Sequence, residues 1–356
     1  MSSTVSSEKF VCSVPNTNYD RVVLGHGSGG TLTADLIQHL FLPAFQNPVL
    51  AEMEDQAVVR LEEGNPSPRI AITTDSYVVR PLFFPGGDIG QLAVYGTVND
   101  LAVGGARPLF LTAAFILEEG LLLEDLQRIV HSMREACRTV GIQLVTGDTK
   151  VVDRGKGDKA FITTTGVGIV PEDCQLSMNQ AQPGDRILVS GTIGDHGMAI
   201  TSVREGLEFE TELKSDVAPL HELTQVMLSA CPSLRWMRDP TRGGVASVLN
   251  ELVEGRSIGA QLDESSLPIR PEVQAACEML GLDPLYVANE GKLIAIVSAE
   301  ESDSLLKVLR AHPLGENAAC IGNIVADRPG LVTLRSTLGG ERMVTRLMGE
   351  QLPRIC

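Results

Sequence analysis

The hydrophobic and polar positions of the first half of the chain switch repeatedly between the period of a strand and that of a helix. An amphipathic helix is predicted over residues 121–141, where apolar positions recur in steps of three and four and Gly141 ends the pattern. Another is predicted to stop at Gly104 and Gly105. A short strand, a glycine loop and a helix are expected over residues 21–45. Apolar, β-branched runs predict strands at residues 57–61, 69–79, 109–117, 142–152 and 159–170.

A change of composition over residues 171–184 separates this half from a second unit that begins at residue 185. Helices are expected there at residues 196–206, 219–231, 243–255, 271–280 and 302–312, and strands at 292–298, 318–325 and 331–336. Because each half mixes strands with amphipathic helices, the fold class is predicted as two α+β domains of similar size. The expected division is a flexible arm (1–20), two domains (21–171 and 172–336) and a mobile tail (337–356).

Composition narrows the class of protein. The 356 residues are 43% hydrophobic, with a net charge of −16, which suits a folded two-domain protein and argues against nucleic-acid binding. No apolar run approaches the ~20 residues of a membrane span, and no secretory signal is recognised, so a cytoplasmic location is expected. The seven cysteines are odd in number and scattered, which argues against a disulfide framework or a zinc cluster. Cys356 is the last residue of the sequence, a position usually exposed.

The glycine-rich loop "GHGSGG" has the spacing G-x-G-x-x-G at Gly25, Gly27 and Gly30. It resembles a dinucleotide fingerprint, but the preceding strand is short and regular βαβ units do not follow. A P-loop is excluded because Thr31 stands where lysine is required. Backbone N–H groups at a helix start still favour an anion. The alternative is an ordinary turn before a helix.

Two further features suggest phosphate chemistry. Arg242 precedes Gly243 and Gly244 at the start of an amphipathic helix, which predicts an anion site, although the arginine can equally cap its own turn. Four aspartates share similar settings, most of them at or after the end of a β-rich run. Each alone is more often a cap or a turn residue, but together they suit Mg²⁺ beside phosphate oxygens; they are Asp55, Asp75, Asp100 and Asp148.

From about Val22 to Cys356 the sequence resembles the HypE family of hydrogenase maturation factors, carbamoyl dehydratases of the PurM-like (aminoimidazole ribonucleotide synthetase) ATP-binding superfamily. The resemblance rests on the segments "TTDSYVV", "GTVNDLAVGGARP", "TGDTKVV", "GDRILVSGTIGDHG", "RDPTRGGVA", "NEGKL" and "PRIC". It implies two α+β domains, a homodimer formed through strands of the N-terminal domain, and ATP with Mg²⁺. It also implies a HypF-like carbamoyltransferase and a HypC/HypD-like iron-carrying scaffold as partners, with no nucleic acid and no membrane.

The activity implied by this resemblance is ATP-dependent dehydration of a carbamoyl group on Cys356 to a thiocyanate, which supplies cyanide to the iron of the [NiFe]-hydrogenase centre. The resemblance assigns catalysis to Cys356, Lys150 and Glu290, and metal binding to the four aspartates. Nucleotide binding is expected at Gly27, Gly29, Gly30, Asn99, Gly147, Thr149, Arg242, Gly243 and Gly244. His26 and His196 are possible helpers, although a lone histidine is usually structural. Two alternatives remain open: a PurM-like phosphotransferase acting on a free small molecule, and a non-catalytic thiol carrier.

Overall fold

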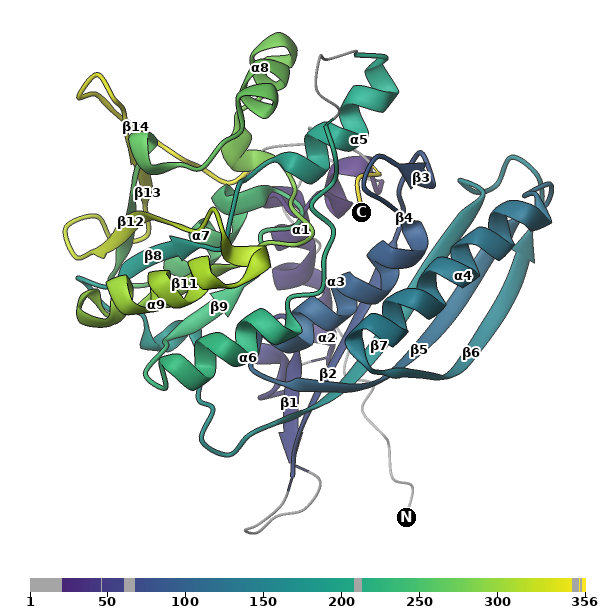
Figure 1. Cartoon of the computed structure of the whole chain (residues 1–356), viewed down its shortest axis with the longest axis horizontal. Helices are drawn as coiled ribbons and strands as arrows, with labels where there is room; N and C mark the ends of the chain where they lie inside the picture. Colours follow the sequence, from purple (N-terminus) through teal and green to yellow (C-terminus); the bar gives the residue numbers. More distant parts are fainter. Residues whose placement is uncertain (1–20, 46, 61–67, 208–212, 348–351, 353) are drawn as a thin grey trace, which may run out of the picture.

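A computed structural model describes residues 21–45, 47–60, 68–207, 213–347, 352 and 354–356. The predicted arm at residues 1–20 lies outside this described part of the chain. Two β-sheets, each with helices packed against it, lie side by side and form the two predicted α+β units (Figure 1). In the part of the chain that the structure describes, no helix has the length and apolarity needed to cross a membrane.

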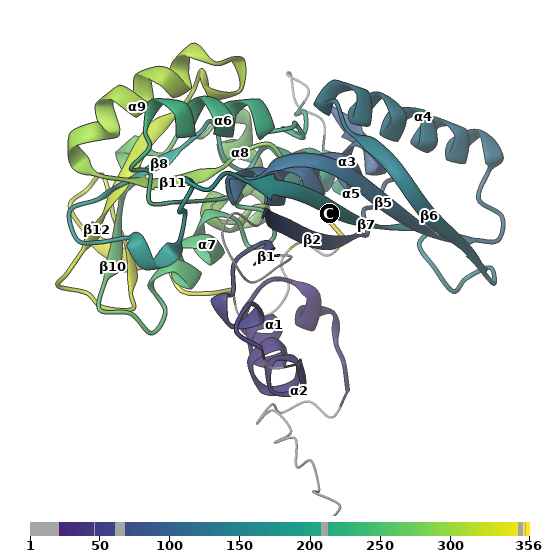
Figure 2. The ribbon, with the colours of Figure 1, turned by 90° about the horizontal axis from the view of Figure 1, so that it is seen from below.

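The first sheet has the strand order β1-β2-β7-β5-β6, and helices α3 and α4 cover one of its faces (Figure 2). All neighbouring strands are antiparallel except β5 and β6, which run parallel. The elements are β1 (Ala57–Arg60), β2 (Arg69–Tyr77), α3 (Ile89–Val103), β5 (Arg107–Glu118), α4 (Leu123–Val140), β6 (Gln143–Val152) and β7 (Ala160–Val170). A small hairpin, β3 (Phe83–Phe84) and β4 (Gly87–Asp88), precedes α3.

The two helices differ because they face different surroundings. In α4 apolar and polar positions alternate with helical period, and Gly141 ends the helix with a positive φ of 77°, as the sequence predicts. In α3, 13 of the 15 residues are buried, since the helix contacts the first sheet on one side and β9 (Trp236–Arg238) and α6 (His221–Ala230) on the other. The Asp88 carboxylate caps α3 by accepting hydrogen bonds from the N–H groups of Gly90 and Gln91.

The second sheet has the strand order β14-β13-β10-β12-β8-β11-β9. Its remaining strands are β8 (Arg186–Val189), β10 (Gly259–Asp263), β11 (Ile294–Val297), β12 (Ala319–Val325), β13 (Val332–Arg335) and β14 (Glu341–Met343). Its remaining helices are α5 (Asp195–Glu205), α7 (Gly244–Val253), α8 (Pro271–Leu280) and α9 (Ala299–Ala311). A large apolar cluster between α7 and the sheet forms the core of this domain.

Two local predictions are wrong, and two strands were missed. The strand expected before the glycine loop is a 3-10 turn, Leu24–Gly27, and the helix that follows is divided into α1 (Thr31–Leu36), a π-helical turn (Ile37–Phe41) and α2 (Leu42–Phe45). The expected tail begins too early, because β14 pairs with β13 beyond residue 337. Finally, β9 and β10 were not predicted, since one is only three residues long and the other mixes glycine and polar residues.

The face of the first sheet opposite α3 and α4 carries exposed apolar side chains. Ile72 and Ile116 are 39% and 42% exposed, and Phe110 is 44% exposed. Strand β6 lies at the edge of the sheet, and nearly all its residues are exposed. We call this surface the open face, and define it by Ile72, Ser76, Phe110, Ile116 and their neighbours in register.

Candidate functional site

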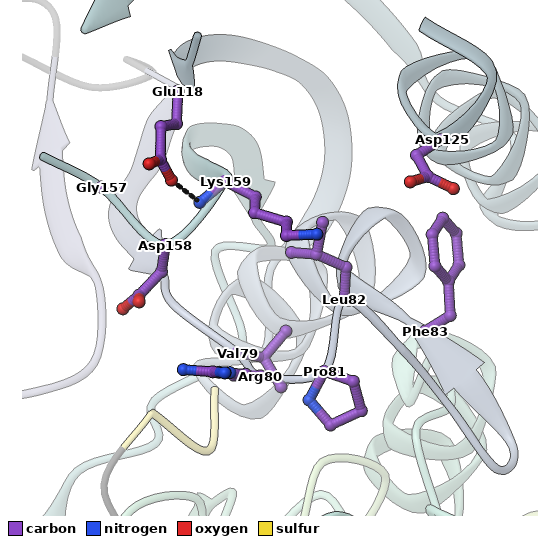
Figure 3. A pocket seen from close by; sticks show the side chains of 10 residues that line it. All are labelled: Val79, Arg80, Pro81, Leu82, Phe83, Glu118, Asp125, Gly157, Asp158 and Lys159. Carbon is purple, nitrogen blue, oxygen red and sulfur yellow. Dashed lines mark hydrogen bonds between the residues drawn. The ribbon is translucent and has the colours of Figure 1, made fainter. Parts of the chain in front are cut away.

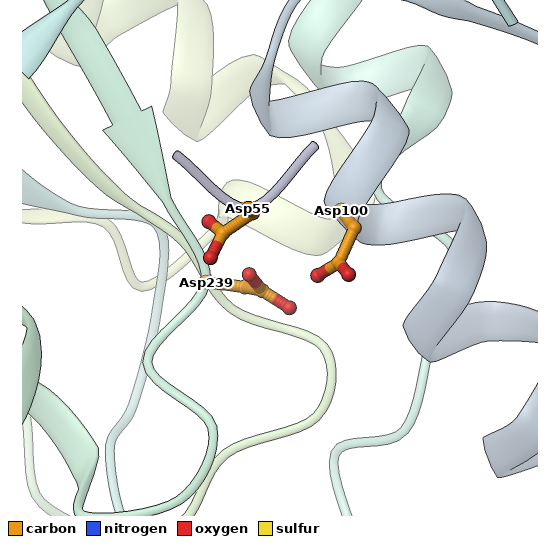
Figure 4. A group of neighbouring side chains, drawn as sticks. All are labelled: Asp55, Asp100 and Asp239. Carbon is orange, nitrogen blue, oxygen red and sulfur yellow. The ribbon is translucent and has the colours of Figure 1, made fainter. Parts of the chain in front are cut away.

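Three carboxylates from separate parts of the chain converge at the junction of the two domains. Asp55 precedes β1, Asp100 lies on α3 and Asp239 follows β9, yet one oxygen from each lies within 4.8 Å of the others (Figure 4). The Thr73 hydroxyl donates a hydrogen bond of 2.8 Å to Asp100. Arg238 lies 2.6 Å from Asp55 and 3.3 Å from Glu251, so part of the acidic charge is balanced.

Crowding and burial change the protonation of this acid cluster, defined as Asp55, Asp100 and Asp239. Burial raises the pKa of Asp55 and Asp100 well above the usual value, although Arg238 opposes the effect at Asp55. Burial likewise raises the pKa of Asp239 to about 7. A divalent cation would offset the repulsion among the ionised forms, so the donor set fits a hard cation such as Mg²⁺.

The acid cluster opens into a cavity of about 560 Å³ between the domains, which we call the acid cavity. Besides the cluster, Asp75, Thr241, Arg242 and Ser247 contribute polar groups to its wall. Apolar side chains line another part; they are Ile37, Phe41, Leu42, Val49, Leu50 and Met53. The cavity therefore combines carboxylates, an arginine and an apolar surface, a combination that suits a nucleoside triphosphate with a cation.

The two glycine-rich loops predicted from the sequence meet at this cavity. The Arg242 guanidinium donates a hydrogen bond of 2.8 Å to the Gly27 carbonyl. Gly29 has a positive φ of 74°, and a side chain there would come within 3.0 Å of the Arg242 carbonyl. Gly243 also has a positive φ, of 76°, and caps the start of α7. The close approach of the loops requires glycine at position 29, whereas a side chain at Gly243 would meet Ser247 of its own helix.

A second, smaller cavity of about 260 Å³ lies on the other side of Arg242 and contains Cys356. We call it the thiol cavity. Arg242 lines both cavities, with Ser76, Val78 and Ala288 among the other residues of the thiol cavity. The wall between the cluster of carboxylates and the thiol is therefore a cationic side chain.

The described residues of the tail are fixed in the thiol cavity by backbone hydrogen bonds. The N–H groups of Val78 and Arg80 donate to the carbonyls of Cys356 and Arg354, at 2.8 and 3.2 Å. This is the register of an antiparallel strand pair. Ile355 is buried in the core of the first domain. The predicted mobile tail thus has an inward position in which its last three residues are specifically bound.

A third cavity, of about 410 Å³, lies beside Arg80 and contributes to the same attachment (Figure 3). Asp158, in its wall, forms an ion pair of 2.9 Å with Arg354 of the tail. Arg204 donates a hydrogen bond to the Arg354 carbonyl. The side chains of Asp158 and Arg204 and the backbone N–H of Arg80 therefore converge on Arg354.

The environment of Cys356 keeps its sulfur protonated when the tail is inward. Burial raises the pKa of the thiol to about 12; Arg242 lowers it, while Glu290, Asp75 and Asp239 add to the increase. Glu290 is only 2% exposed, and among the described residues its Oε1 has no hydrogen-bond partner. Burial, followed by the charge of Asp239, raises the pKa of Glu290 well above its usual value. An unpartnered, buried carboxyl group beside the thiol is a candidate for proton transfer.

Asp148 was predicted to bind metal together with the other aspartates, and for the residues of one chain this prediction has to be corrected. Asp148 is opposite Ala114, Ala114 is opposite Thr163, and Thr163 is opposite Ser76, so Asp148 lies on the open face. Asp75 is the neighbour of Ser76 and points to the other face, since side chains alternate along a strand. Asp148 is therefore separated from the acid cluster by the sheet.

Other predicted site residues are also placed away from the cavities. Lys150 is exposed on β6 and pairs with Asp148 at 2.6 Å, while Gly147 and Thr149 lie on the same exposed strand. Asn99 is buried, and its amide joins the domains: it donates to the carbonyls of Ala218 and Glu290 and accepts from the N–H of Leu220. These bonds occupy the Asn99 amide, so the side chain links the two domains. It does not make the nucleotide contact that was predicted.

Gly27, Gly29, Arg242, Gly243, Asp55, Asp75 and Asp100 do line the two cavities, and Gly30 and Gly244 adjoin them. Asp239 was missed as a metal-binding candidate, although it stands in the "RDPTRGG" segment; its place three residues before Arg242 in a predicted anion-binding loop was the available signal. His196 was considered only as a possible helper and contacts the tail directly.

Both halves of the chain match models of AIR synthase related proteins. The N-terminal domain model matches residues 53–170 and the C-terminal domain model residues 182–334. The chain therefore belongs to the AIR synthase related family of two-domain, PurM-like proteins.

Relatives with higher sequence identity place the chain in one group within this class. The chain is 57% identical to carbamoyl dehydratase HypE of Azotobacter vinelandii, over 94% of this chain and 97% of the relative. It is similar to a HypE crystal structure in complex with ATP, with 48% identity, a TM-score of 0.78 and coverage of 94% of this chain and 100% of that one. It is also similar to a chain of a HypE–HypF complex, with 46% identity, a TM-score of 0.81 and coverage of 88% and 99%. Within its class, this is a member of the HypE carbamoyl dehydratases.

Proposed function

We propose that this chain converts a carbamoyl group carried on the sulfur of Cys356 into a thiocyanate, with ATP as the co-substrate. The overall reaction is R–S–C(=O)–NH₂ + ATP → R–S–C≡N + ADP + phosphate, in which the carbamoyl oxygen leaves with the γ-phosphoryl group. The observation that carries this proposal is the position of Arg242 between the acid cavity and the thiol cavity. One side chain adjoins both reactants.

In this proposal ATP occupies the acid cavity; that a HypE relative has been crystallised with ATP supports the choice of nucleotide. The adenine contacts the apolar wall near Phe41, and the phosphates extend toward Arg242 and the glycine loops. Asp55, Asp100 and Asp239 would hold Mg²⁺, which neutralises charge on the transferring phosphoryl group. Positioning by the two loops contributes much of the rate, because well-oriented reactants gain ~7–11 kcal/mol from proximity.

Glu290 is proposed as the base that accepts protons from the carbamoyl nitrogen as the C≡N bond forms. The nitrogen must lose two protons, and the phosphorylated oxygen must depart. A carboxylate whose pKa is raised holds a proton more strongly than an ordinary one, which is what a base of this kind requires. Arg242 is placed to stabilise the negative charge of the departing phosphate.

The names of the relatives suggest the remaining steps. Because one relative is present in a HypE–HypF complex, we propose that a HypF-like carbamoyltransferase loads Cys356 when the tail is outward. A HypC/HypD-like iron carrier then receives the cyanide that the [NiFe]-hydrogenase centre needs. A cytoplasmic location remains a prediction.

The substitution Cys356→Ala tests the proposal. Mass spectrometry of the intact protein, incubated with ATP and the carbamoyl-donating partner, is expected to show gain of a carbamoyl group and then loss of one water. Cys356→Ala should abolish both changes, whereas Cys320→Ala, at another half-buried cysteine, should leave them intact. Thiocyanate formed by Cys356→Ala would refute the proposal. Carbamoylation without ATP-dependent loss of water would support the thiol-carrier alternative, and phosphorylation of a free small molecule the other one.

We further propose that two copies associate through their open faces. This surface carries exposed Ile72, Phe110 and Ile116, and Lys150 of edge strand β6 lies on it opposite Ile116. Clusters of exposed apolar groups on a sheet favour association. Ser76 of the open face also lines the thiol cavity, so a second copy would bring its Asp148 and Lys150 near that cavity. This explains how residues remote from the site within one chain serve the predicted roles.

Light scattering after size-exclusion chromatography tests this association. Ile116→Asp places a charge in the middle of the open face and is expected to give monomers with greatly reduced dehydration. Val226→Asp, at a residue on α6 that is 41% exposed, is the matched control and should remain dimeric. A dimeric, fully active Ile116→Asp variant would contradict the proposed interface.

A further inference from the structure

A buried histidine contacts the tail at the residue before Cys356. His196 is the second residue of α5, is fully buried, and packs edge-on against Phe84 with ring centroids 5.6 Å apart. Its Nε2 lies 2.7 Å from the Ile355 carbonyl oxygen, and its Nδ1 lies 2.7 Å from the Ser215 hydroxyl. The proposed mechanism does not use this side chain.

The neighbouring bonds determine the tautomer of His196. The Ser215 oxygen accepts a hydrogen bond from the N–H of Val217 at 3.1 Å, so the serine proton is available for Nδ1. If Nδ1 accepts, Nε2 carries the hydrogen and donates to the Ile355 carbonyl. Burial lowers the pKa of His196, which favours the neutral ring that this pattern requires.

His196 completes a strand-like set of bonds around the tail. The carbonyls of Arg354 and Cys356 point to the backbone of Arg80 and Val78, and the Ile355 carbonyl between them points the opposite way. On that opposite side the imidazole supplies the donor that a neighbouring strand would otherwise provide. The segment from Arg354 to Cys356 is thereby held by hydrogen bonds on both of its edges.

The same short segment also holds the proposed base. Ser215 orients His196, and the adjacent Asp216 accepts a hydrogen bond of 3.0 Å from the backbone N–H of Glu290. Asp216 in turn lies 3.5 Å from the ammonium group of Lys292. Two consecutive residues therefore connect the position of the tail to the position of Glu290.

We propose that His196, oriented by Ser215, is a positioning residue that binds the Ile355 carbonyl and thereby directs the sulfur of Cys356 toward Arg242 and Glu290. This inference rests on the proposed function for its catalytic consequence, but the docking itself does not depend on it. His196 does not touch the reacting atoms. It acts through the backbone of the tail.

Alkylation of Cys356 measures docking without ATP or a carbamoyl donor. In the full-length protein, iodoacetamide reaches the thiol when the tail is outward, so the rate follows the outward population if tail motion is fast. His196→Leu removes the donor and is expected to raise the alkylation rate of Cys356 about tenfold, the factor that corresponds to ~1.4 kcal/mol for one lost buried hydrogen bond. His196→Gln keeps an N–H donor and should restore most of the protection. Ser215→Ala should fall between them.

His221→Leu is the matched control, because His221 is a partly buried histidine on α6 that does not belong to the tail contacts. It should alkylate at the wild-type rate, and the buried Cys277 should remain unlabelled in every variant. Wild-type alkylation rates in both His196→Leu and Ser215→Ala would overturn the inference. If His196→Leu does not fold, the comparison of Ser215→Ala with wild type decides it in the same way.

Kinetics separate positioning from general structural support. With Cys356 already carbamoylated, His196→Leu should lower kcat for dehydration about tenfold while KM for ATP stays unchanged, and His196→Gln should recover kcat. A rise in KM for ATP with unchanged kcat would contradict the positioning role. Failure of the wild type to form any thiocyanate would refute the proposed function, whereas the alkylation result would still stand or fall separately.

Discussion

The two cavities that share Arg242 differ in the charge of the groups that line them. The acid cavity gathers Asp55, Asp100 and Asp239 within 4.8 Å in its wall. The thiol cavity surrounds Cys356 with backbone contacts and apolar groups, and keeps its sulfur neutral. A cation and a polyphosphate suit the first, and an uncharged thiocarbamate suits the second. In the proposed function, ATP therefore binds in one cavity and the carbamoylated Cys356 binds in the other.

The largest expected effect comes from Glu290, whose charge helps to raise the pKa of the Cys356 thiol. Glu290→Gln preserves the shape but removes the base, so kcat for dehydration should fall about 10²–10⁴-fold. Binding of ATP should change little, because the acid cavity is untouched. Isothermal titration with ATP and single-turnover mass spectrometry measure the two quantities. Equal losses in both would show that the two cavities are not functionally distinct.

The same carboxyl group predicts a pH dependence. A base acts only when deprotonated, and the pKa of Glu290 is raised, so kcat should increase with pH through a range above that of an ordinary glutamate. Glu290→Gln should lack this limb of the profile. A wild-type kcat that is constant from about pH 5 to 8 would exclude Glu290 as the titrating base.

The next largest effect is expected from a substitution in the acid cavity. Asp100→Asn keeps an oxygen for the Thr73 hydroxyl but removes a charge, so Mg²⁺-dependent ATP affinity should fall about 10–100-fold. The alkylation rate of Cys356 should remain that of the wild type, since the contacts of the tail are elsewhere. Asp303→Asn, at an exposed aspartate on α9, provides a control of identical chemistry. A large change in Cys356 alkylation would argue against the separation.

The smallest expected effect concerns stability without nucleotide. The pKa values of Asp55, Asp100 and Asp239 are raised in the folded protein, so their protonated forms stabilise it at low pH. That stabilisation is lost as pH rises through the folded-state values, which for Asp239 is about 7. The Tm should therefore fall by a few degrees, about 2–4 °C per kcal/mol, between pH 5 and 8. Mg²⁺ should restore it most at the higher pH. A Tm that rises over this range in metal-free buffer would contradict the assignment.

Local patterns were sufficient to predict much of the fold. The period of α4 and its stop at Gly141 were readable because the helix has one buried side. The sequence also predicted an anion site at both the glycine loop and the Arg242 loop, because each places backbone N–H groups at a helix start, with an ordinary turn as the alternative. It could not predict that each loop restricts the other, because the contact of Gly29 with Arg242 spans most of the chain.

The predicted site contains errors because the information needed to place its residues is not present in any single segment of the sequence. Asp75 and Asp148 occur in similar local sequences, but the register through β7 and β5 places them on opposite faces of the sheet. Asn99 looks available for a ligand until the carbonyl of Ala218, from the other domain, is brought next to it. Strand register and domain contact are set by the whole fold.

The hydrogen bonds that hold the tail have a consequence for the order of events. Val78, Arg80 and His196 all bind main-chain carbonyls, and none of these bonds involves the sulfur atom. The attachment therefore has the same bonding partners whether the side chain carries a thiol, a carbamoyl group or a cyano group. Completion of the chemistry does not by itself weaken the attachment, so a partner that competes for the segment at residues 78–80 would promote departure of the product, as when one strand displaces another from the edge of a sheet.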